Sequence, residues 1–506
     1  MCGILGIVNY NDDTDYTQYI NSIKHRGPDN TNNIVYKNIY FYFHRLCIND
    51  LSDNGNQPFE NSKYIWMCNG EIYNYKALID QYNLDCVSNS DCEVIGHLLE
   101  KVSFIKLHDI LDGVFSISIY DKLANKIYLM RDSIGVRPLY YCRYVTKFMF
   151  ASEGKALQPD KNIKQLNPRE ILIHDCDFNI IDTIQTSIFD YKINHNLNLN
   201  SVIPMIKILL ESSIEKRLIS DRPIGCLLSG GLDSSIVASV LSKLLKKQNK
   251  VLKTFSVGFK DSEDLKYARK VATYINSDHY ELILDYDEVI KRIPEVVKAI
   301  ETYDVTTIRA SMGMYLLSEY ISQHHEEKVI FSGEGSDEIF GGYLYFHKSP
   351  TIEQFEAETT ELVQNLYYYD VLRADRCTAS FGLELRVPFL DKQFVKFVTS
   401  IPGFLRKYTD LEKYILRMAF KDDYLPIEII KRQKEGFSDG VGGMKKPFYA
   451  HIQESLKINK DTNLDNAEKE YYKSIFLSSY SYNPIPKYWM PKWINTNNPS
   501  GRILMN

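Results

Sequence analysis

The sequence lacks the features that mark membrane, secreted and nucleic-acid-binding proteins. Among its 506 residues no apolar run approaches the roughly 18 residues that a membrane span needs. The amino terminus, MCGILGIVNY, turns polar at its end and has no basic segment of the kind that begins a secretory signal. A formal net charge of −5 provides no basic field for a phosphate backbone. We therefore expect a cytoplasmic protein without nucleic-acid or membrane partners.

Paired cysteines are absent as well. The nine cysteines are an odd number and form no C-x-x-C motif, so neither a disulfide framework nor a zinc cage is indicated. There is no repeat of solenoid period. With 44% hydrophobic and 25% charged residues the composition is that of a globular protein, and the length predicts two or more domains.

The first part of the chain is dominated by strand patterns. Val114 to Tyr120 alternate in polarity, and after a turn Ile127 to Met130 return, which predicts a hairpin. Tyr64 to Asn69 and Phe41 to Ile48 are expected to be further strands. These patterns predict a domain rich in strands and turns.

After Tyr191 the pattern changes. The polar stretch INHNLNLNS has no periodicity, and beyond it apolar positions between 236 and 245 share one helical face. Val251 to Phe259 and Lys328 to Phe331 are predicted strands, and strands that alternate with helices favour a parallel sheet wrapped on both faces. The expected division is a first domain at 2–190, a linker at 191–202 and a second domain at 203–506.

Cys2 is a candidate amino-terminal nucleophile, because removal of Met1 would leave it a free α-amine beside its thiol. Such an amine has a pKa of about 8, so a useful fraction is unprotonated at neutral pH and can accept the thiol proton, directly or through one water. On its own, Met-Cys is explained as well by a small second residue that permits methionine excision. The surrounding motifs decide between these interpretations.

Five motifs, MCGILGIV, RGPD, HRLCI, NGEIYN and SDCEV, begin at residues 1, 26, 44, 69 and 90. In order and approximate spacing they resemble class II glutamine amidotransferases. The resemblance implies an α+β, Ntn-type (αββα) fold in which Cys2 attacks the amide of glutamine. It further implies the following glutamine site: Asn69 and Gly70 as oxyanion donors, Arg45 for the α-carboxylate, Asp91 for the α-ammonium, and Glu71 beside them. Taken singly, Arg45 and Asp91 would be surface ion pairs.

A candidate phosphate loop, SGGLDSS, spans Ser229 to Ser235 between an apolar run and the amphipathic helix. Gly230 and Gly231 permit a tight turn whose N–H groups, with the helix amino terminus, can face an anion. A Walker A motif is excluded because no G-K-[ST] follows. An isolated SGG could be an ordinary strand-to-helix turn, but with Asp233 it resembles the PP-loop of enzymes that cleave ATP between the α and β phosphates.

A second loop, SGEGSDE, begins at Ser332 after another predicted strand and carries Glu334, Asp337 and Glu338. Carboxylates that face a pyrophosphate repel it unless a cation intervenes, so the pairing implies Mg²⁺. By the resemblance, Asp233 and Asp337 would ligate that ion. An acidic loop without a ligand would be a solvated face; the position at the end of a sheet strand favours binding instead.

Four longer segments, ETYDVTTIRAS, SGEGSDEIFGGYLYFHK, RVPFLDK and RQKEGFSDGVG, resemble the signatures of asparagine synthetases, and the resemblance covers nearly the whole chain. It implies an α/β PP-loop domain that uses ATP and glutamine-derived ammonia to convert aspartate to asparagine through β-aspartyl-AMP, releasing AMP, PPi and glutamate. The implied ATP-binding residues are Leu228, Ser229, Gly230, Gly231, Asp233, Ser234, Val257, Ser332 and Gly333. The implied residues for the reaction are Thr306 and Arg309 at the α-phosphorus, Lys434 for the amidation step or pyrophosphate, and Glu334, Asp337 and Arg386 at aspartate.

Two alternatives stay open. Another acyl-adenylate amidotransferase, such as a β-lactam synthetase-like enzyme, would use the same loop on a different carboxylate, although cyclising relatives need no ammonia and hence no Cys2. A non-catalytic nucleotide- or amino-acid-binding regulator would retain the fold, although every expected reactive group is present. Assembly is open too, with a homodimer among the possibilities.

Overall fold

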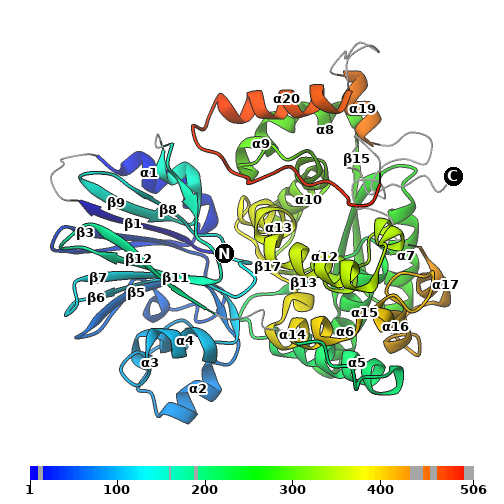
Figure 1. The fold of residues 1–506 in the computed structure, drawn as a ribbon, viewed down its shortest axis with the longest axis horizontal. Coiled ribbons are helices and arrows are strands. Elements are labelled where there is room, and N and C mark those ends of the chain that lie inside the picture. The colour runs from blue at the N-terminus through cyan, green and yellow to red at the C-terminus, as the bar shows by residue number, and fades with distance from the viewer. Residues whose placement is uncertain (10–14, 159–160, 187–191, 434–447, 456–463, 495–506) are drawn as a thin grey trace.

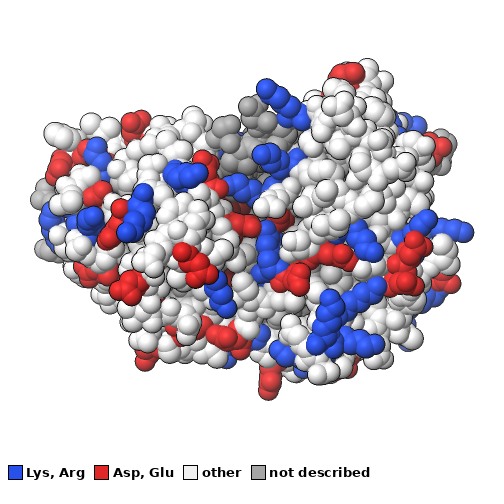
Figure 2. Space-filling view, turned by 90° about the horizontal axis from the view of Figure 1, so that it is seen from below, with Lys and Arg blue, Asp and Glu red and all other residues white. Residues whose placement is uncertain are grey.

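The computed structural model describes residues 1–9, 15–158, 161–186, 192–433, 448–455 and 464–494. It has two lobes (Figure 1): an amino-terminal one, blue to cyan, built mainly of strands, and a carboxy-terminal one, green to red, in which helices surround a sheet. In the described residues no helix combines the length and apolar character required to cross a membrane. On the face seen in Figure 2, basic and acidic side chains are interspersed over both lobes rather than gathered into a field of one sign.

The amino-terminal lobe consists of two six-stranded antiparallel sheets. The first, in the order β10-β8-β9-β1-β3-β2, contains β1 (Gly3–Asn9), β2 (Asn30–Tyr36), β3 (Ile39–Arg45), β8 (Tyr140–Arg143), β9 (Lys147–Ala151) and β10 (Lys164–Gln165). The second, in the order β12-β11-β7-β6-β5-β4, contains β4 (Phe59–Glu60), β5 (Tyr64–Ile72), β6 (Gly113–Asp121), β7 (Lys126–Arg131), β11 (Glu170–Asp175) and β12 (Ile180–Gln185).

Strand β5 shows why the sheets are layered in this way. Its odd-numbered residues Ile65 and Met67 belong to the core between the two sheets, whereas Trp66 and Cys68 belong to a core under helices. Successive side chains of a strand point to opposite faces, so β5 is apolar on both. The helices of this lobe are α1 (Thr17–Ser22), α2 (Tyr75–Tyr82), α3 (Val94–Leu98) and α4 (Phe104–Ile110), the last three packing on the second sheet. The Ntn-type αββα expectation is confirmed.

The strand predictions in this lobe hold, with one difference. β6 and β7 form the predicted hairpin, and β5 covers Tyr64 to Asn69. β3, however, ends at Arg45 rather than Ile48. Beyond it the backbone turns toward Cys2, whose sulfur accepts a hydrogen bond from the Leu46 N–H at 3.4 Å.

The carboxy-terminal lobe contains the predicted parallel sheet, in the order β15-β14-β13-β16-β17. Its strands are β13 (Ile224–Leu227), β14 (Lys253–Phe259), β15 (Asp278–Leu284), β16 (Val329–Phe331) and β17 (Glu384–Arg386). The principal helices are α5 (Leu199–Lys216), α6 (Leu232–Lys247), α7 (Glu263–Ile275), α9 (Ile293–Ile300), α10 (Val305–His324), α11 (Ser336–Phe340), α12 (Ile352–Asn365), α13 (Asp370–Ala379), α14 (Lys392–Ser400), α16 (Tyr414–Ala419), α17 (Ile427–Lys431), α19 (Phe448–Ser455) and α20 (Leu464–Leu477). The described part of the lobe also contains α8 (Tyr286–Lys291), α15 (Gly403–Arg406) and the 3₁₀ turns Leu344–Lys348, Leu366–Tyr368 and Pro388–Leu390.

Between the lobes lies the predicted linker, 191–202. The last strand of the second sheet, β12, ends at Gln185, and α5 begins at Leu199 behind an Asn198 cap whose side chain accepts from the Ser201 N–H. The final residues of the predicted linker thus form the first turn of α5. The domain limits themselves stay a prediction.

Buried ion pairs join the two lobes. Arg26 Nη1 lies 2.7 Å from Glu153 and 2.9 Å from Asp375, and Arg376 lies 2.6 Å from Glu153. Arg137 donates to the Leu385 carbonyl oxygen at 3.0 Å. All these side chains are buried, so removing one partner would leave an uncompensated charge in the interface. These buried contacts therefore stabilise the interface between the lobes.

Candidate active sites

The SGGLDSS loop is a tight turn between β13 and α6. Gly230 has φ +73°, and a Cβ there would lie 2.4 Å from the Ala268 nitrogen. The Ser229 N–H donates to Ser234 Oγ at 3.2 Å, and the Gly231 N–H donates to Ser229 Oγ at 3.3 Å. The tight turn forms because Gly230 can adopt the left-handed conformation and because the side chains of Ser229 and Ser234 accept hydrogen bonds from N–H groups of the loop.

The second loop approaches the first very closely. β13 and β16 are neighbouring parallel strands, so the loops that follow them leave the same edge of the sheet. A Cβ at Gly333 would lie 2.8 Å from the Ser234 nitrogen, which shows that glycine is required for this contact. One cavity lies between the loops. The predicted residues that line it are Leu228, Ser229, Gly231, Asp233, Ser234, Val257, Thr306, Ser332, Gly333, Glu334 and Asp337.

Lys413 bridges the two predicted metal ligands. Its Nζ lies 2.6 Å from Asp233 Oδ2 and 2.6 Å from Asp337 Oδ1, and its side chain is 2% exposed. Asp233 also accepts from Ser336 Oγ at 2.7 Å. The two carboxylates therefore converge on a positive charge, which is the arrangement that a cation site requires.

Other groups of the cavity surround this pair. Arg373 donates to Glu334 at 2.9 Å and to Asp370 at 2.7 Å, which orients the Glu334 carboxylate. The Thr306 hydroxyl lines the cavity and has no hydrogen-bond partner among the described residues. Burial, with the charges of Asp370 and Asp337, raises the pKa of Glu338 to about 8. The cavity thus combines acids, a fixed guanidinium and a hydroxyl that can still donate.

Some predicted residues lie elsewhere. Arg309 does not line the cavity; it pairs with the buried Glu468 through Nε at 2.9 Å and Nη2 at 2.6 Å. Arg386 is also absent from the lining and lies between the lobes, 2.8 Å from Glu384 and 3.6 Å from Glu71. Gly230 does not line the cavity; it packs against the backbone of Tyr267 and Ala268. Lys434 falls outside the described residues.

A second, smaller pocket surrounds Cys2 in the amino-terminal lobe. With Met1 in place, the Cys2 nitrogen is a peptide N–H that donates to Asn69 Oδ1 at 2.8 Å, and Arg26 Nε donates to the Cys2 carbonyl oxygen at 2.9 Å. Burial raises the pKa of the Cys2 thiol and lowers that of the Met1 amine to about 6. Met1 also lines the pocket, so its excision would both enlarge the pocket and release the Cys2 amine.

Asn69 and Gly70 have the properties that oxyanion donors need. Asn69 is fully buried, and its Nδ2 has no hydrogen-bond partner among the described residues. A Cβ at Gly70 would lie 2.1 Å from the Val114 carbonyl oxygen, so only glycine fits at this point of β5. A buried, unsatisfied amide donor beside Cys2 is costly unless a ligand accepts from it.

Three carboxylates line this pocket, those of Glu71, Asp91 and Glu384. Asp91 accepts from the Ile72 N–H at 2.6 Å, and burial raises its pKa to about 6. Burial raises the pKa of Glu71 well above its usual range, and the nearby charges of Asp91 and Glu384 raise it further. Such a cluster fits an ammonium group. Glu384 comes from β17, so the carboxy-terminal lobe contributes to the pocket.

Arg45 lines the pocket but is strongly engaged. Its Nη1 donates to the Ser52 carbonyl oxygen at 2.7 Å and to Asn56 Oδ1 at 2.9 Å, and its Nη2 donates to the Asn49 and Asp50 carbonyl oxygens. The guanidinium therefore shapes the loop that borders the pocket. A ligand carboxylate at Arg45 would have to share or replace these acceptors.

Comparison with known proteins agrees with this pair of sites. The glutamine amidotransferase domain model matches residues 1–195, and the asparagine synthase model matches residues 205–362 and 348–479. The asparagine synthetase [glutamine-hydrolyzing] of Gallus gallus is 40% identical, with 100% of this chain and 98% of that protein covered, and that of Mus musculus is similar to the same extent. The Homo sapiens protein of that name is 39% identical with equal coverage.

The chain belongs to the family of glutamine-hydrolysing asparagine synthetases.

As a member of this family the chain is a carbon–nitrogen ligase with an amidotransferase domain and a PP-loop domain. The structure adds residues that the sequence motifs did not indicate, namely Lys413, Arg373 and Glu384. Lys413 lies in the stretch DLEKYIL, which matches no motif, and Arg373 is one of two arginines in α13. Their importance comes from tertiary contacts, for which one sequence carries no signal.

Proposed function

We propose that the chain makes L-asparagine from L-aspartate, ATP and the ammonia that it releases from L-glutamine. The observation that carries this proposal is the coexistence of two preformed sites in one chain. The Cys2 pocket offers a thiol and an acid cluster, and the buried, unsatisfied amide of Asn69 is hydrogen-bonded to the Cys2 nitrogen behind it. The PP-loop cavity offers a tight glycine loop and paired carboxylates.

In the first half-reaction, excision of Met1 frees the α-amine of Cys2, which takes the thiol proton. The sulfur attacks the amide carbon of glutamine, and Asn69 Nδ2 and the Gly70 N–H donate to the oxyanion. The tetrahedral intermediate collapses to a thioester as the proton passes to the leaving NH₃. Water then releases glutamate and restores Cys2. Asp91 and Glu71 would hold the α-ammonium, and Arg45 the α-carboxylate.

In the second half-reaction, a side-chain oxygen of aspartate attacks the α-phosphorus of ATP and pyrophosphate leaves, which gives β-aspartyl-AMP. Ammonia then adds to the acyl carbon, AMP departs, and a proton is lost to give asparagine. Thr306, which lines the cavity, would donate to a phosphate oxygen, and Glu334, oriented by Arg373, would act at the aspartate carboxylate. We assign Lys434 to the developing negative charge of the amidation step or of pyrophosphate.

Asp233 and Asp337 are the residues that would hold Mg²⁺. They fit, because the two carboxylates already converge on one positive charge, the Lys413 ammonium. A bound Mg²⁺ would neutralise phosphate charge beside these carboxylates. The Lys413 ammonium would then pair with pyrophosphate oxygens instead of Asp233. The negative charge of Asp233 and Asp337 would be balanced by Lys413 when nucleotide is absent and by Mg²⁺ when it is bound.

Two further predicted residues act at a distance in this proposal. Arg309, paired with Glu468, would position α10, which carries Thr306. Arg386, at the end of β17, lies 3.6 Å from Glu71 of the glutamine pocket. It would therefore link the two sites in addition to its predicted role at aspartate. Ammonia would pass between the sites through the buried interface of the lobes, where contact with water and protonation are limited.

The test is to incubate the purified chain with ATP, Mg²⁺, glutamine and a panel of amino-acid carboxylates, and to identify the products by mass spectrometry. We expect asparagine, AMP and PPi with aspartate only. Amidation or cyclisation of another carboxylate would identify a different acyl-adenylate enzyme. ATP binding without AMP release would identify a regulator. Cytoplasmic location and a homodimer stay predictions, and light scattering of the pure protein checks the latter.

A further inference from the structure

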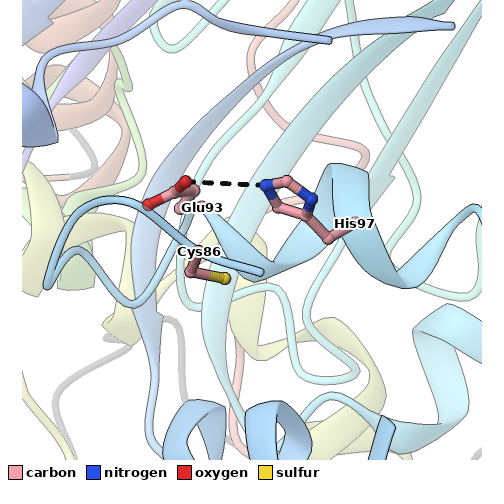
Figure 3. A group of neighbouring side chains, drawn as sticks. All are labelled: Cys86, Glu93 and His97. Carbon is pink, nitrogen blue, oxygen red and sulfur yellow. Dashed lines mark ion pairs between the residues drawn. The ribbon is translucent and has the colours of Figure 1, made fainter. Parts of the chain in front are cut away.

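A cluster of three potential metal ligands lies outside both active sites, in the amino-terminal lobe at the start of α3. Figure 3 shows Cys86 in the segment that precedes this helix, Glu93 at its amino-terminal cap and His97 one turn later, with Glu93 and His97 turned toward each other and Cys86 beside them. The thiol sulfur, one ring nitrogen and one carboxylate oxygen all lie within 4.8 Å of one another. No other group of three such side chains occurs among the residues that the structure describes.

We propose that Cys86, Glu93 and His97 bind one zinc ion, with a water molecule as the fourth ligand. A thiolate, an imidazole and a carboxylate form a donor set that suits a borderline-soft cation, whereas Mg²⁺ and Ca²⁺ take oxygen ligands. The site would be separate from the predicted Mg²⁺ site, which is built from carboxylates only.

The distances require only a small closure. Zinc bonds of about 2.0 to 2.3 Å in a tetrahedron place ligand atoms about 3.5 Å apart. Because all three ligand atoms lie within 4.8 Å of one another, no pair has to approach by more than about 1.3 Å. His97 Nε2 and Glu93 Oε1 are already 3.5 Å apart. Cys86 and His97 are half-buried, so both side chains can turn about χ1. A metal ion can therefore reach the cluster from solvent.

The surroundings hold the ligands in place. Glu93 accepts from the Val87 N–H at 2.8 Å and the Ser88 N–H at 2.7 Å, so its carboxylate is fixed by backbone donors. The His97 ring packs edge-on against Trp66, with centroids 6.0 Å apart. Partners of this kind orient metal ligands in established sites. Oε2 of Glu93 also accepts from the Ser88 hydroxyl at 2.5 Å, so Oε1, which accepts from the Val87 N–H, is the oxygen that retains a lone pair for a cation.

The charge around the thiol also favours a cation. The carboxylates of Glu93 and Asp85 both lie near the Cys86 thiol and make its environment anionic. Zinc binding forms a Zn–S bond and releases the thiol proton to water, which leaves the net charge of zinc, thiolate and Glu93 at zero. Because Glu93 follows Asp91 by two residues, the ion would fix the segment that borders the glutamine pocket.

The experiment is a titration of the full-length protein with Co²⁺, whose bond to a thiolate gives a charge-transfer band in the near ultraviolet, followed by competition with Zn²⁺. We expect one equivalent to bind with this band in the wild type and in Cys2→Ser, the control for the other half-buried nucleophilic thiol. Cys86→Ser should bind without the band, or not at all. His97→Phe, which keeps a ring against Trp66, should bind at least about tenfold more weakly.

Absence of the band in the wild type, or its persistence in Cys86→Ser, would overturn the proposal, as would unchanged affinity in His97→Phe. Cys86 and His97 are preferred to Glu93 for substitution because neither holds the backbone of the 87–88 turn. Circular dichroism of each variant establishes that it is folded. The glutamine and ATP activities play no part in this readout, so the result is independent of the proposed function.

Discussion

Replacement of Lys413 by methionine tests how the acid pair of the PP-loop cavity is compensated. Methionine keeps much of the apolar stem and removes the ammonium that lies 2.6 Å from both Asp233 and Asp337. Loss of one partner of a buried ion pair costs about 3 to 5 kcal/mol. Both aspartates are 13% exposed and so are partly screened, and we therefore expect a loss near the lower end, about 3 kcal/mol.

The assay is thermal unfolding in EDTA and in Mg²⁺. In EDTA the transition of Lys413→Met should fall by about 5 °C relative to the wild type. Mg²⁺ at 100 times its dissociation constant contributes about 2.7 kcal/mol, so it should restore most of the loss, and it should stabilise the variant more than the wild type because no ammonium competes for the carboxylates. Isothermal titration should likewise show tighter Mg²⁺ binding to the variant.

Lys216→Met is the matched control, because Lys216 also bridges two carboxylates, those of Asp112 and Asp391, but lies outside the cavity. It should lose some stability that Mg²⁺ does not restore. The reasoning would be refuted if Lys413→Met were as stable as the wild type in EDTA, or if Mg²⁺ rescued both lysine variants equally.

Three further outcomes are expected. Asn69→Ala should lower kcat for glutamine hydrolysis by about 10²- to 10³-fold, the usual effect of losing one oxyanion donor. Ammonia-supported synthesis should be unchanged in this variant. A change in KM alone would contradict the assignment of Asn69 as an oxyanion donor. Burial raises the pKa of the Asp91 carboxyl to about 6, so this group is charged above that pH and neutral below it. The KM for glutamine should therefore rise about tenfold by pH 5. Asp91→Asn should show a high KM that does not vary with pH. Gly333→Ala places a Cβ 2.8 Å from the Ser234 nitrogen and should suppress ATP–PPi exchange but spare glutaminase activity, and normal exchange would show that the loops can separate.

The sequence predicts the elements whose local pattern is strong. The β6–β7 hairpin, the long helix α6 and the parallel strands β14 and β16 follow from periodicity and from the turn residues between them. Strand ends are less certain, as β3 shows. It stops at Arg45 because that side chain and Leu46 make tertiary hydrogen bonds to a loop and to Cys2, which periodicity does not encode.

The site residues likewise fall into those that the motifs predict and those that only the tertiary structure reveals. Motif residues such as Asp233 and Glu334 reach the cavity because each follows a strand whose place in the sheet fixes it. Arg386 belongs to a motif as well, yet it is buried against Glu384 and Glu71 between the lobes. Lys413 has no motif but occupies the centre of the acid pair. Contacts between segments distant in sequence decide these positions, and one sequence does not reveal them.

The most direct test of the two-site account is a Cys2→Ala variant assayed for asparagine formation with glutamine and, separately, with ammonium salts. Cys2 lies in a pocket of the amino-terminal lobe that shares no lining residue with the PP-loop cavity. The account predicts that glutamine-supported synthesis is lost while ammonia-supported synthesis and its ATP consumption continue at the wild-type rate. Loss of both activities in a folded variant, or retention of the glutamine-supported activity, would contradict it.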